Sequence, residues 1–467
     1  MIPWLNSELL LVSLKALALS LILTPILRDI FRSYDVVDRP GYRRVHVYPI
    51  PRIGGIPIAV GYAVALYGVT ELKDNLGFDI WKLIPGATVI FLTGLIDDFW
   101  NLRPVVKLGG QIIAALVVFA SGLRIETLGA GEPLPLWLNL PLTVFWLLLT
   151  TNAFNLIDGL DGLCGGIGLL ATLTMFGGAL LSGNEPLAYA TLPLACALAG
   201  FLFYNFNPAT VFLGDSGALL IGFLLGCYGM IWTQKTSTLF SLLVPLMALS
   251  VPLLDVGVAV LRRSLSRQPI FKADRAHIHH RLLDRGLTPQ NTVLVLWVFA
   301  ALAAGMALLL TAPQVEPYRN LLLAILAVGI LFGLRELRYK EFVDLGKMLF
   351  SADMRHTLEV KVELERWSHE LSSKKTTEEW WKAVTVAGER FGWIRLYWVG
   401  PAGIQERVYG ETAPDWTFLV PLGNQGSLQI DGRAEDGRFT ISELAAVLAK
   451  SAATLPRTGK TSKVHST

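Results

Sequence analysis

The sequence is poor in charge. Asp, Glu, Lys and Arg make up 16% of its 467 residues, against about 25% in an ordinary soluble protein. Because 53% of the residues are hydrophobic, the composition excludes both a typical soluble globule and a disordered chain. The formal net charge of +3 is too balanced for a general nucleic-acid binder, so we expect no nucleic-acid partner.

Cysteine is also rare. Cys164, Cys196 and Cys227 lie inside apolar runs and lack the paired spacing of a zinc site or a redox centre. We interpret them as residues that fill the core or face lipid. The apolar run in the first thirty residues lacks the basic start and the cleavage pattern of a signal peptide, so we interpret it as a first membrane span.

Long apolar stretches are abundant instead. A bilayer core about 30 Å thick requires about 20 mostly apolar residues in a helix, and about eleven segments of the chain approach that length. Since the runs are continuous and lipid offers no partner to unpaired backbone, helices are favoured over strands. The sequence therefore predicts an α-helical polytopic membrane protein with about eleven transmembrane helices. Their centres lie near Ala18, Ala63, Val89, Val117, Leu147, Leu170, Leu194, Phe223, Met247, Ala300 and Ala327.

Basic residues are distributed unequally between the connections. Those that follow the odd-numbered segments hold fifteen Lys and Arg residues, and the others hold five. By the positive-inside rule the first set faces the cytoplasm, which places the amino terminus outside and the carboxyl tail inside. Four polar clusters, described next, all lie on the predicted cytoplasmic side.

The first cluster is a pair of adjacent carboxylates, Asp97 and Asp98, at the end of the third segment. Two such groups repel each other, which raises the proton affinity of one unless a cation lies close. Lys107 and Gln111 follow, four residues apart on one side of the next helix. For this pair alone, a helix end that displays charge to water remains the favoured alternative.

The second cluster is NAFNLIDGLDGLCGG at 152–166, in which Asn152, Asn155, Asp158 and Asp161 are spaced by three. This spacing places their side chains roughly on one face of a helix or turn. Carboxylate and amide oxygens are the ligands that a hard cation such as magnesium prefers. The residues could instead cap a loop between membrane helices, but four of them in so apolar a region favour function.

The third cluster places Asp215 between two small residues directly before an apolar segment, in the stretch FLGDSG. The start of the following helix could offer unpaired amides to an anion. An Asp at that place could equally be the N-cap of the helix, so the sequence leaves both alternatives open.

The fourth cluster, FKADRAHIHHRLLDRG at 271–286, contains His277, His279, His280 and Arg281. Histidine clusters suggest zinc, but the neighbouring arginines disfavour a cation site and suit bound phosphates. A basic loop attracted to anionic lipid would account for the arginines but not for three histidines in four positions.

Together with DRPGYRRVHVYPIPRIGG at 38–55, the four stretches resemble the polyprenyl-phosphate N-acetylhexosamine-1-phosphate transferase family over roughly residues 38–286. The resemblance implies that the phosphate of a membrane polyprenol attacks the β-phosphorus of a UDP-sugar, giving a polyprenyl diphosphate sugar and UMP. The loop AHIHHRLLDRG is similar to the undecaprenyl-phosphate N-acetylglucosaminyl 1-phosphate transferase branch. We therefore expect N-acetylglucosamine 1-phosphate to be transferred to undecaprenyl phosphate in the first membrane step of a cell-envelope polysaccharide.

The resemblance also implies roles for individual residues. Asn155 and Asp215 would hold Mg²⁺, with Mn²⁺ as an alternative, and Asp97 or Asp98 would deprotonate or orient the lipid phosphate. Direct attack is favoured over a covalent phospho-enzyme, because a phosphate monoester with a second pKa of about 6 is already nucleophilic. The uridine end would contact Asp161, Asn205 and Phe212. The other implied substrate contacts are Arg52, Lys107, Asn152, Asp158, His277, His279, His280 and Arg281.

The expected location is the bacterial inner membrane, with the active site and the C-terminus in the cytoplasm. A transporter or flippase for an anionic or lipid-linked substrate is the alternative, since it too would place ionisable residues among membrane helices. Its site is expected near mid-membrane, whereas these clusters lie at span ends. The sequence leaves open whether the protein forms a homodimer.

The composition changes beyond Leu334, where charge and tryptophan increase. We expect a transmembrane transferase domain at 1–335, a cytoplasmic α+β domain at 336–456 that is faintly similar to a GAF-like fold, and a disordered tail at 457–467. Helices are predicted over 359–372, 377–391 and 440–453, and strands over 394–399, 417–421 and 427–430. Two roles are possible for this domain: it could bind a regulatory ligand or partner, or it could be a passive appendage.

Overall fold

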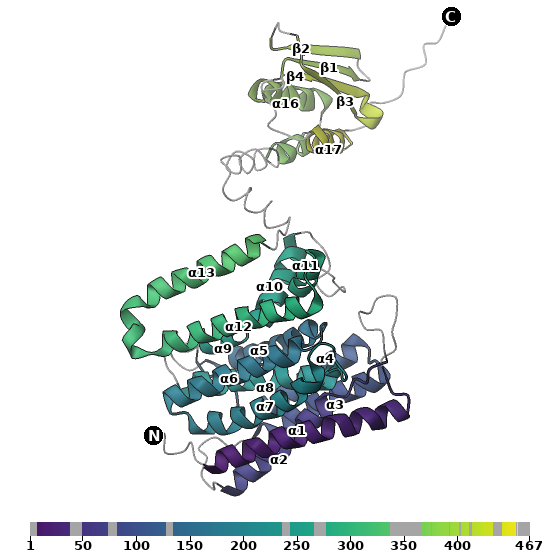
Figure 1. Cartoon of the computed structure of the whole chain (residues 1–467). Helices are drawn as coiled ribbons and strands as arrows, with labels where there is room; N and C mark the ends of the chain where they lie inside the picture. Colours follow the sequence, from purple (N-terminus) through teal and green to yellow (C-terminus); the bar gives the residue numbers. More distant parts are fainter. Residues whose placement is uncertain are drawn as a thin grey trace, which may run out of the picture. The chain divides into compact units, whose positions relative to one another are not determined.

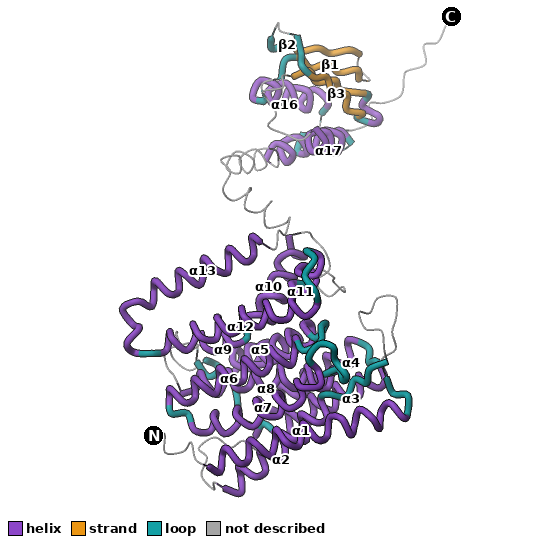
Figure 2. Tube along the Cα trace, viewed as in Figure 1, coloured by secondary structure: helices purple, strands orange, loops and turns teal. Residues whose placement is uncertain are grey.

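The computed structural model describes residues 7–37, 49–72, 82–127, 134–235, 243–265 and 277–336, and most of the chain from 364 to 455 apart from short gaps. The chain divides into two compact units, Met1–Glu341 and Phe342–Thr467. Each unit is described by itself. Figure 2 shows helices throughout the described part of the first unit, and strands together with helices in the second.

The first unit is a bundle of helices (Figure 1). In chain order they are α1 Ser7–Ser33, α2 Gly55–Leu72, α3 Ile84–Trp100, α4 Pro104–Ala120, α5 Leu136–Ile157, α6 Leu163–Ser182, α7 Glu185–Asn205, α8 Gly214–Lys235, α9 Leu243–Ala248, α10 Ser250–Leu265, α11 Ile278–Asp284, α12 Pro289–Thr311, the 3₁₀ helix η3 Pro313–Tyr318, and α13 Arg319–Glu336.

Six of the described helices, α1, α5, α6, α7, α8 and α12, are long and apolar enough to cross a membrane. All eleven segment centres predicted from the sequence lie in helices. The other five centres lie in helices outside this set of six, and the ninth apolar segment is divided at Leu249 into α9 and α10. A mostly helical protein with several membrane-capable helices is therefore confirmed, while the count of eleven spans stays a prediction.

Helix α8 is the core of the bundle. The most apolar stretch of α8 is 94% buried, against 33% to 67% for the other five membrane-capable helices, and α2, α3, α5 and α6 all pack against it. Glycines permit these close contacts: a Cβ atom on Gly94 of α3 would lie 2.6 Å from the backbone of Ser216, and one on Gly222 would lie 2.6 Å from the carbonyl oxygen of Thr150. The end of α3 is thereby held directly against the start of α8.

The second unit has a four-stranded antiparallel sheet with helices packed against it. Its elements are a helical segment at 366–372, α16 Thr377–Arg390, β1 Arg395–Gly400, β2 Gly403–Val408, β3 Trp416–Pro421, β4 Ser427–Gly432 and α17 Ile441–Ala452. The strand order is β2-β1-β4-β3. Leu396, Trp398, Leu428 and Ile430 alternate along β1 and β4 and are almost fully buried, in one apolar cluster with Trp380 of α16.

The helices predicted over 377–391 and 440–453 and the three predicted strands are confirmed. The helix predicted over 359–372 is confirmed at 366–372, while residues 359–363 lie outside the described residues. One strand was missed. β2 is absent from the sequence prediction because its residues are almost all exposed, so no alternation of apolar and polar residues marks it. The tail predicted to be disordered at 457–467 lies outside the described residues.

Candidate active site

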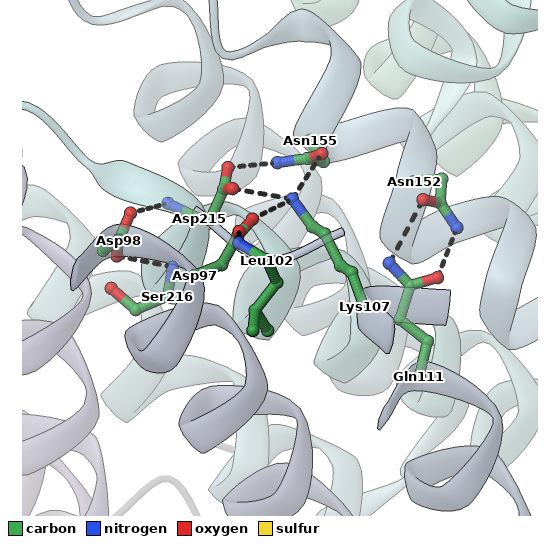
Figure 3. A network of polar contacts seen from close by, with 9 residues as sticks. All are labelled: Asp97, Asp98, Leu102, Lys107, Gln111, Asn152, Asn155, Asp215 and Ser216. Atoms are coloured by element: carbon green, nitrogen blue, oxygen red, sulfur yellow. Dashed lines mark hydrogen bonds and ion pairs between the residues drawn. The ribbon is translucent and has the colours of Figure 1, made fainter. Parts of the chain in front are cut away.

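The ammonium group of Lys107, on α4, is the centre of a polar network (Figure 3). Its Nζ atom lies 2.9 Å from Oδ2 of Asp97 and 2.7 Å from Oδ2 of Asp215. It also donates to Oδ1 of Asn155 over 3.2 Å. Asn155 Nδ2 in turn donates to Asp215 Oδ1 over 2.6 Å. Side chains from α3, α4, α5 and α8 therefore meet at one point.

The network is only partly open to solvent. The exposed fraction of the side chain is 10% for Asp97, 15% for Lys107 and 32% for Asp215, so Asp215 is the most accessible of the three. Two carboxylates face one ammonium group, which leaves an excess of negative charge on a partly buried cluster. Such a cluster favours a further cation nearby.

Asp98 has a different environment from its neighbour. Its two carboxylate oxygens accept the backbone N–H groups of Asp215 and Ser216, over 2.7 Å and 3.0 Å. Gly214, with φ of +75°, leaves room for this contact, because a Cβ atom there would lie 2.8 Å from the Asp98 oxygens. Asp98 thus caps the start of α8 from another helix, and the amides that could have met a substrate anion bind Asp98 instead.

Asn152 lies one turn before Asn155 on α5 and is paired with α4. Its Nδ2 donates to Gln111 Oε1 over 2.7 Å, and Gln111 Nε2 donates back to Asn152 Oδ1 over 3.2 Å. This reciprocal amide pair joins the two helices that carry Asn155 and Lys107. Gln111 was noted in the sequence only through its spacing from Lys107.

Asp161 and Asn205 connect the loop after α5 to the loop after α7. Asp161 Oδ2 accepts from Asn207 Nδ2 and from the backbone of Ala209, each over 3.0 Å. Asn205, which is 4% exposed, accepts the N–H of Gly162 over 3.1 Å and donates to the carbonyl of Val211 over 2.9 Å. Both side chains therefore form hydrogen bonds within the protein.

The segment before α2 lies against the same loops. Arg52 and Phe212 form an isolated parallel bridge, in which Phe212 donates its N–H to the carbonyl of Pro51 over 3.0 Å and accepts the N–H of Gly54 over 2.9 Å. Arg52 is close enough to Asp158 to act on its carboxyl charge. Burial, together with the nearby Asp215 and Asp98 carboxylates, nevertheless raises the pKa of Asp158 to about 8.

The histidines of the fourth cluster are stacked. The rings of His277 and His279 are nearly parallel with centroids 5.9 Å apart, and His280 lies 4.3 Å from His279. The His279 ring touches the loop after α5, because a Cβ atom on Gly159 would lie 2.9 Å from its Nε2. Burial, helped by the two neighbouring histidines, lowers the pKa of His279 to about 4, so this imidazole is neutral at physiological pH.

A functional candidate that the sequence analysis missed, Asp255 of α10, lies behind the stack. Its Oδ2 is 2.9 Å from His277 Nδ1, and its Oδ1 accepts the N–H of Ile278 over 2.7 Å. The signal that could have revealed it is an ionisable residue inside an apolar segment, SVPLLDVGVAVL, since such residues are rare in membrane helices and usually functional.

Comparison with known proteins matches residues 80–233 to the family described as glycosyl transferase family 4. A probable undecaprenyl-phosphate N-acetylglucosaminyl 1-phosphate transferase from Bacillus subtilis is 34% identical over 341 residues, which cover 70% of this chain and 93% of that protein. The chain belongs to glycosyl transferase family 4.

Two further relatives of this family 4 protein carry related names. The decaprenyl-phosphate N-acetylglucosaminephosphotransferase of Mycobacterium tuberculosis strain CDC 1551 is 32% identical over 64% of the chain and 81% of its own length. The undecaprenyl-phosphate alpha-N-acetylglucosaminyl 1-phosphate transferase of Escherichia coli K12 is 26% identical over 66% of the chain and 85% of its own length.

Membership of family 4 identifies the chain as an enzyme, a transferase rather than a carrier. The residues that the sequence analysis selected as a family 4 site fall into three groups in the structure. Those of the central network are Asp97, Asp98, Lys107, Asn155 and Asp215, with Asn152 one turn away. Those of the adjoining loops are Arg52, Asp158, Asp161, Asn205 and Phe212. Those of the α11 segment are His277, His279, His280 and Arg281. This segment contacts the loop after α5 through His279.

Proposed function

We propose that this protein transfers N-acetylglucosamine 1-phosphate from its UDP derivative to undecaprenyl phosphate, releasing UMP, as the first membrane step of a cell-envelope polysaccharide. One observation carries the proposal: oxygen atoms of Asp97, Asn155 and Asp215, from three helices, converge on the single cation Lys107 Nζ. A diphosphate that is being cleaved accumulates negative charge, so its site requires cations held in place beforehand. The names of the three relatives support the same reaction.

The same oxygens fit a divalent cation. Among the described residues, no three His, Cys, Asp or Glu side chains form a metal-binding group; the converging set is two carboxylates and one amide, which are ligands suited to Mg²⁺ or Mn²⁺. Members of the family generally depend on a divalent metal. Asn155 and Asp215, with Asp97 beside them, would hold the ion, which supplies positive charge to the diphosphate oxygens.

The residues of the chain have distinct roles in this proposal. Asp97, whose Oδ2 faces the network, orients the lipid phosphate, whereas Asp98 is bonded to the backbone of α8 and holds Asp215 in position. A lipid phosphate oxygen forms a bond to the β-phosphorus, the bond from that phosphorus to the bridging oxygen breaks, and UMP leaves with the electron pair. The lipid phosphate needs no strong base, because its second pKa is about 6.

The nucleotide-sugar is proposed to lie between the loops and the α11 segment. His277, His279, His280 and Arg281 would contact its phosphates or sugar. Arg52 and Lys107, like Arg281, would supply positive charge. Phe212 would stack on the uracil ring. Asp161 and Asn205 already hold neighbouring loops together, so we propose that they shape the uridine end and contact it only at its edge.

The remaining sequence expectations are part of the same proposal. Eleven membrane spans follow from the apolar segments. An amino terminus outside the bacterial inner membrane and a cytoplasmic active site follow from the positive-inside rule. Residues 1–335 would be the transferase domain. Residues 336–456 would be a cytoplasmic α+β domain of GAF-like type that binds a regulatory ligand or partner. A homodimer is compatible with this organisation. A transporter or flippase has no observation in its favour.

The decisive experiment is a product analysis. The purified protein in detergent is incubated with undecaprenyl phosphate, Mg²⁺ and a panel of UDP-sugars, and the lipid product is identified by mass spectrometry. We expect undecaprenyl diphosphate N-acetylglucosamine together with released UMP. Transfer of another sugar would correct the substrate, and binding of UDP-sugar without cleavage would refute the reaction.

Asp215→Asn tests the network itself. The change removes one negative charge from the group that faces Lys107 and Asn155, so turnover should fall by about 100-fold or more, as for loss of a single transition-state contact. Magnesium-dependent UMP release is measured, and Asp29→Asn, at a carboxylate with 64% of its side chain exposed, is the matched control. Full activity of the Asp215 variant would contradict the assignment.

A further inference from the structure

Asp255 of α10 is a carboxylate with 2% of its surface exposed. Burying an ionised carboxylate is unfavourable unless both of its oxygens find partners. Here each oxygen has one: Oδ2 contacts His277 Nδ1 and Oδ1 accepts the N–H of Ile278. The first residues of α11 are thereby attached to α10 by a single side chain.

The contact determines which nitrogen of His277 carries the proton. An ionised carboxylate can only accept hydrogen bonds, so Nδ1 must be the donor. Nε2 is then the nitrogen that can accept a hydrogen bond, and the carboxylate behind the ring fixes the orientation of the imidazole.

The position of the ring links this pair to the site. His277, which is 7% exposed, lies parallel to His279, and His279 packs on Gly159 between Asp158 and Leu160. The pair Asp255–His277 is therefore one ring removed from the loop that follows Asn155. Among the described residues, His277 is the one of the two stacked imidazoles that has a carboxylate at hydrogen-bond distance.

We infer that Asp255 is a positioning residue of the transfer reaction: it holds His277 with Nδ1 protonated, so that Nε2 accepts a hydrogen bond from a hydroxyl or amide N–H group of the nucleotide-sugar. The inference rests on the proposed function and adds a residue to it. The alternative is that Asp255 serves only to cap the short helix α11 through Ile278, in which case its effect would not pass through His277.

A double-mutant cycle distinguishes these two roles. Asp255→Asn keeps an oxygen for the Ile278 amide but presents an NH₂ group to Nδ1, which reverses the protonation of the ring. Asp255→Asn and His277→Ala should each lower kcat/KM for UDP-N-acetylglucosamine by about 10- to 100-fold, as outer-shell partners of site residues do. The double variant should be no less active than the less active of the two single variants. KM for undecaprenyl phosphate should stay unchanged. Asp284→Asn, an exposed residue at the end of α11, is the control. Losses that multiply, or an Asp255→Asn enzyme as active as wild type, would overturn the inference.

A second measurement does not depend on turnover. In protein labelled with ¹⁵N-histidine, the resonances that disappear in His277→Ala are assigned to His277, one of seven histidines. We expect the pattern of a ring protonated at Nδ1 in wild type and a change of that pattern in Asp255→Asn; a ring protonated only at Nε2 in wild type would refute the inference. If Asp255→Asn does not fold, Asp255→Ala, which also removes the carboxylate, replaces it in the cycle, with the same criterion. Absence of sugar-phosphate transfer by wild type would reject the proposed function, whereas the ¹⁵N spectra still decide the pairing.

Discussion

Asp97 and Asp98 are neighbours in the sequence but not in their contacts. Successive residues on a helix point about 100° apart, so Asp97 faces Lys107 on α4 while Asp98 faces the first amides of α8. The sequence predicted that this pair matters and left open which carboxylate meets the lipid phosphate. That division of roles depends on which helix lies on each side of α3, and no local pattern encodes it.

The two carboxylates should therefore respond differently to the same substitution. Asp98→Asn turns an NH₂ group toward one of the two α8 amides that Asp98 accepts, so stability should fall by about 1 to 3 kcal/mol and the Mg²⁺ concentration for half-maximal turnover should rise. Asp97→Asn can still accept from the Leu102 amide, so it should keep its stability and lose turnover. Thermal unfolding and magnesium titration of both variants check this; identical behaviour of the two would contradict it.

The pH dependence of stability tests the environment of Asp158. Its pKa in the folded protein is about 8, above the value of about 3.9 for an exposed Asp. The folded state therefore binds this proton more tightly than the unfolded chain does, so the contribution of Asp158 favours folding most below about pH 4 and is lost as the pH rises to about 8. When a chelator is present, the unfolding temperature of wild type should decline with pH between about pH 5 and 8. The decline should be less steep in Asp158→Asn. Equal slopes for wild type, Asp158→Asn and the control Asp284→Asn would be evidence against this environment.

At the scale of elements, the apolar runs predicted where helices lie but not how they pack. Each predicted centre falls in a helix because about 20 apolar residues leave few other structures in lipid. The central position of α8 was not predictable, since its apolar content resembles that of its neighbours. Its glycines, together with Gly94 of α3, permit the close contacts that bury it. Asp255 was missed for a related reason: its partner His277 lies 22 residues away on another element.

Gly94→Ala tests the contact between α3 and α8. The added methyl group would lie 2.6 Å from the backbone of Asp215 and Ser216, so the helices must separate, at a cost of about 1 to 3 kcal/mol. Because this contact carries Asp98 and Asp215, turnover should fall together with stability. Gly109→Ala on α4, where no atom of the described residues lies within 4 Å of the new methyl group, is the matched control and should leave turnover unchanged and stability equal or slightly higher. A Gly94→Ala enzyme that matches this control would show that the contact is less tight than described.

At the scale of the whole molecule, the candidate site lies entirely in one of the two units. Every residue of the candidate site lies in Met1–Glu341, and the second unit has its own apolar core around Trp380 and Trp398. Strands β1, β3 and β4 were predicted as segments joined by polar turns, whereas the exposed β2, with the sequence GIQERV, was not recognised as a strand. Neither the sequence nor the sheet identifies a ligand, so the role of this unit is a question for experiment.

Ending the chain after Glu341 should leave kcat and both KM values unchanged in detergent, because no side chain of the site is removed and the core of the first unit is complete without the second. UMP release by the purified full-length and shortened proteins checks this. A lower kcat would show that the second unit contributes to the site itself. With turnover unchanged, the amount of lipid-linked sugar in cells under varied growth conditions separates the two remaining roles. A response that is lost on truncation indicates regulation by the second unit, and a response that is retained indicates a passive appendage.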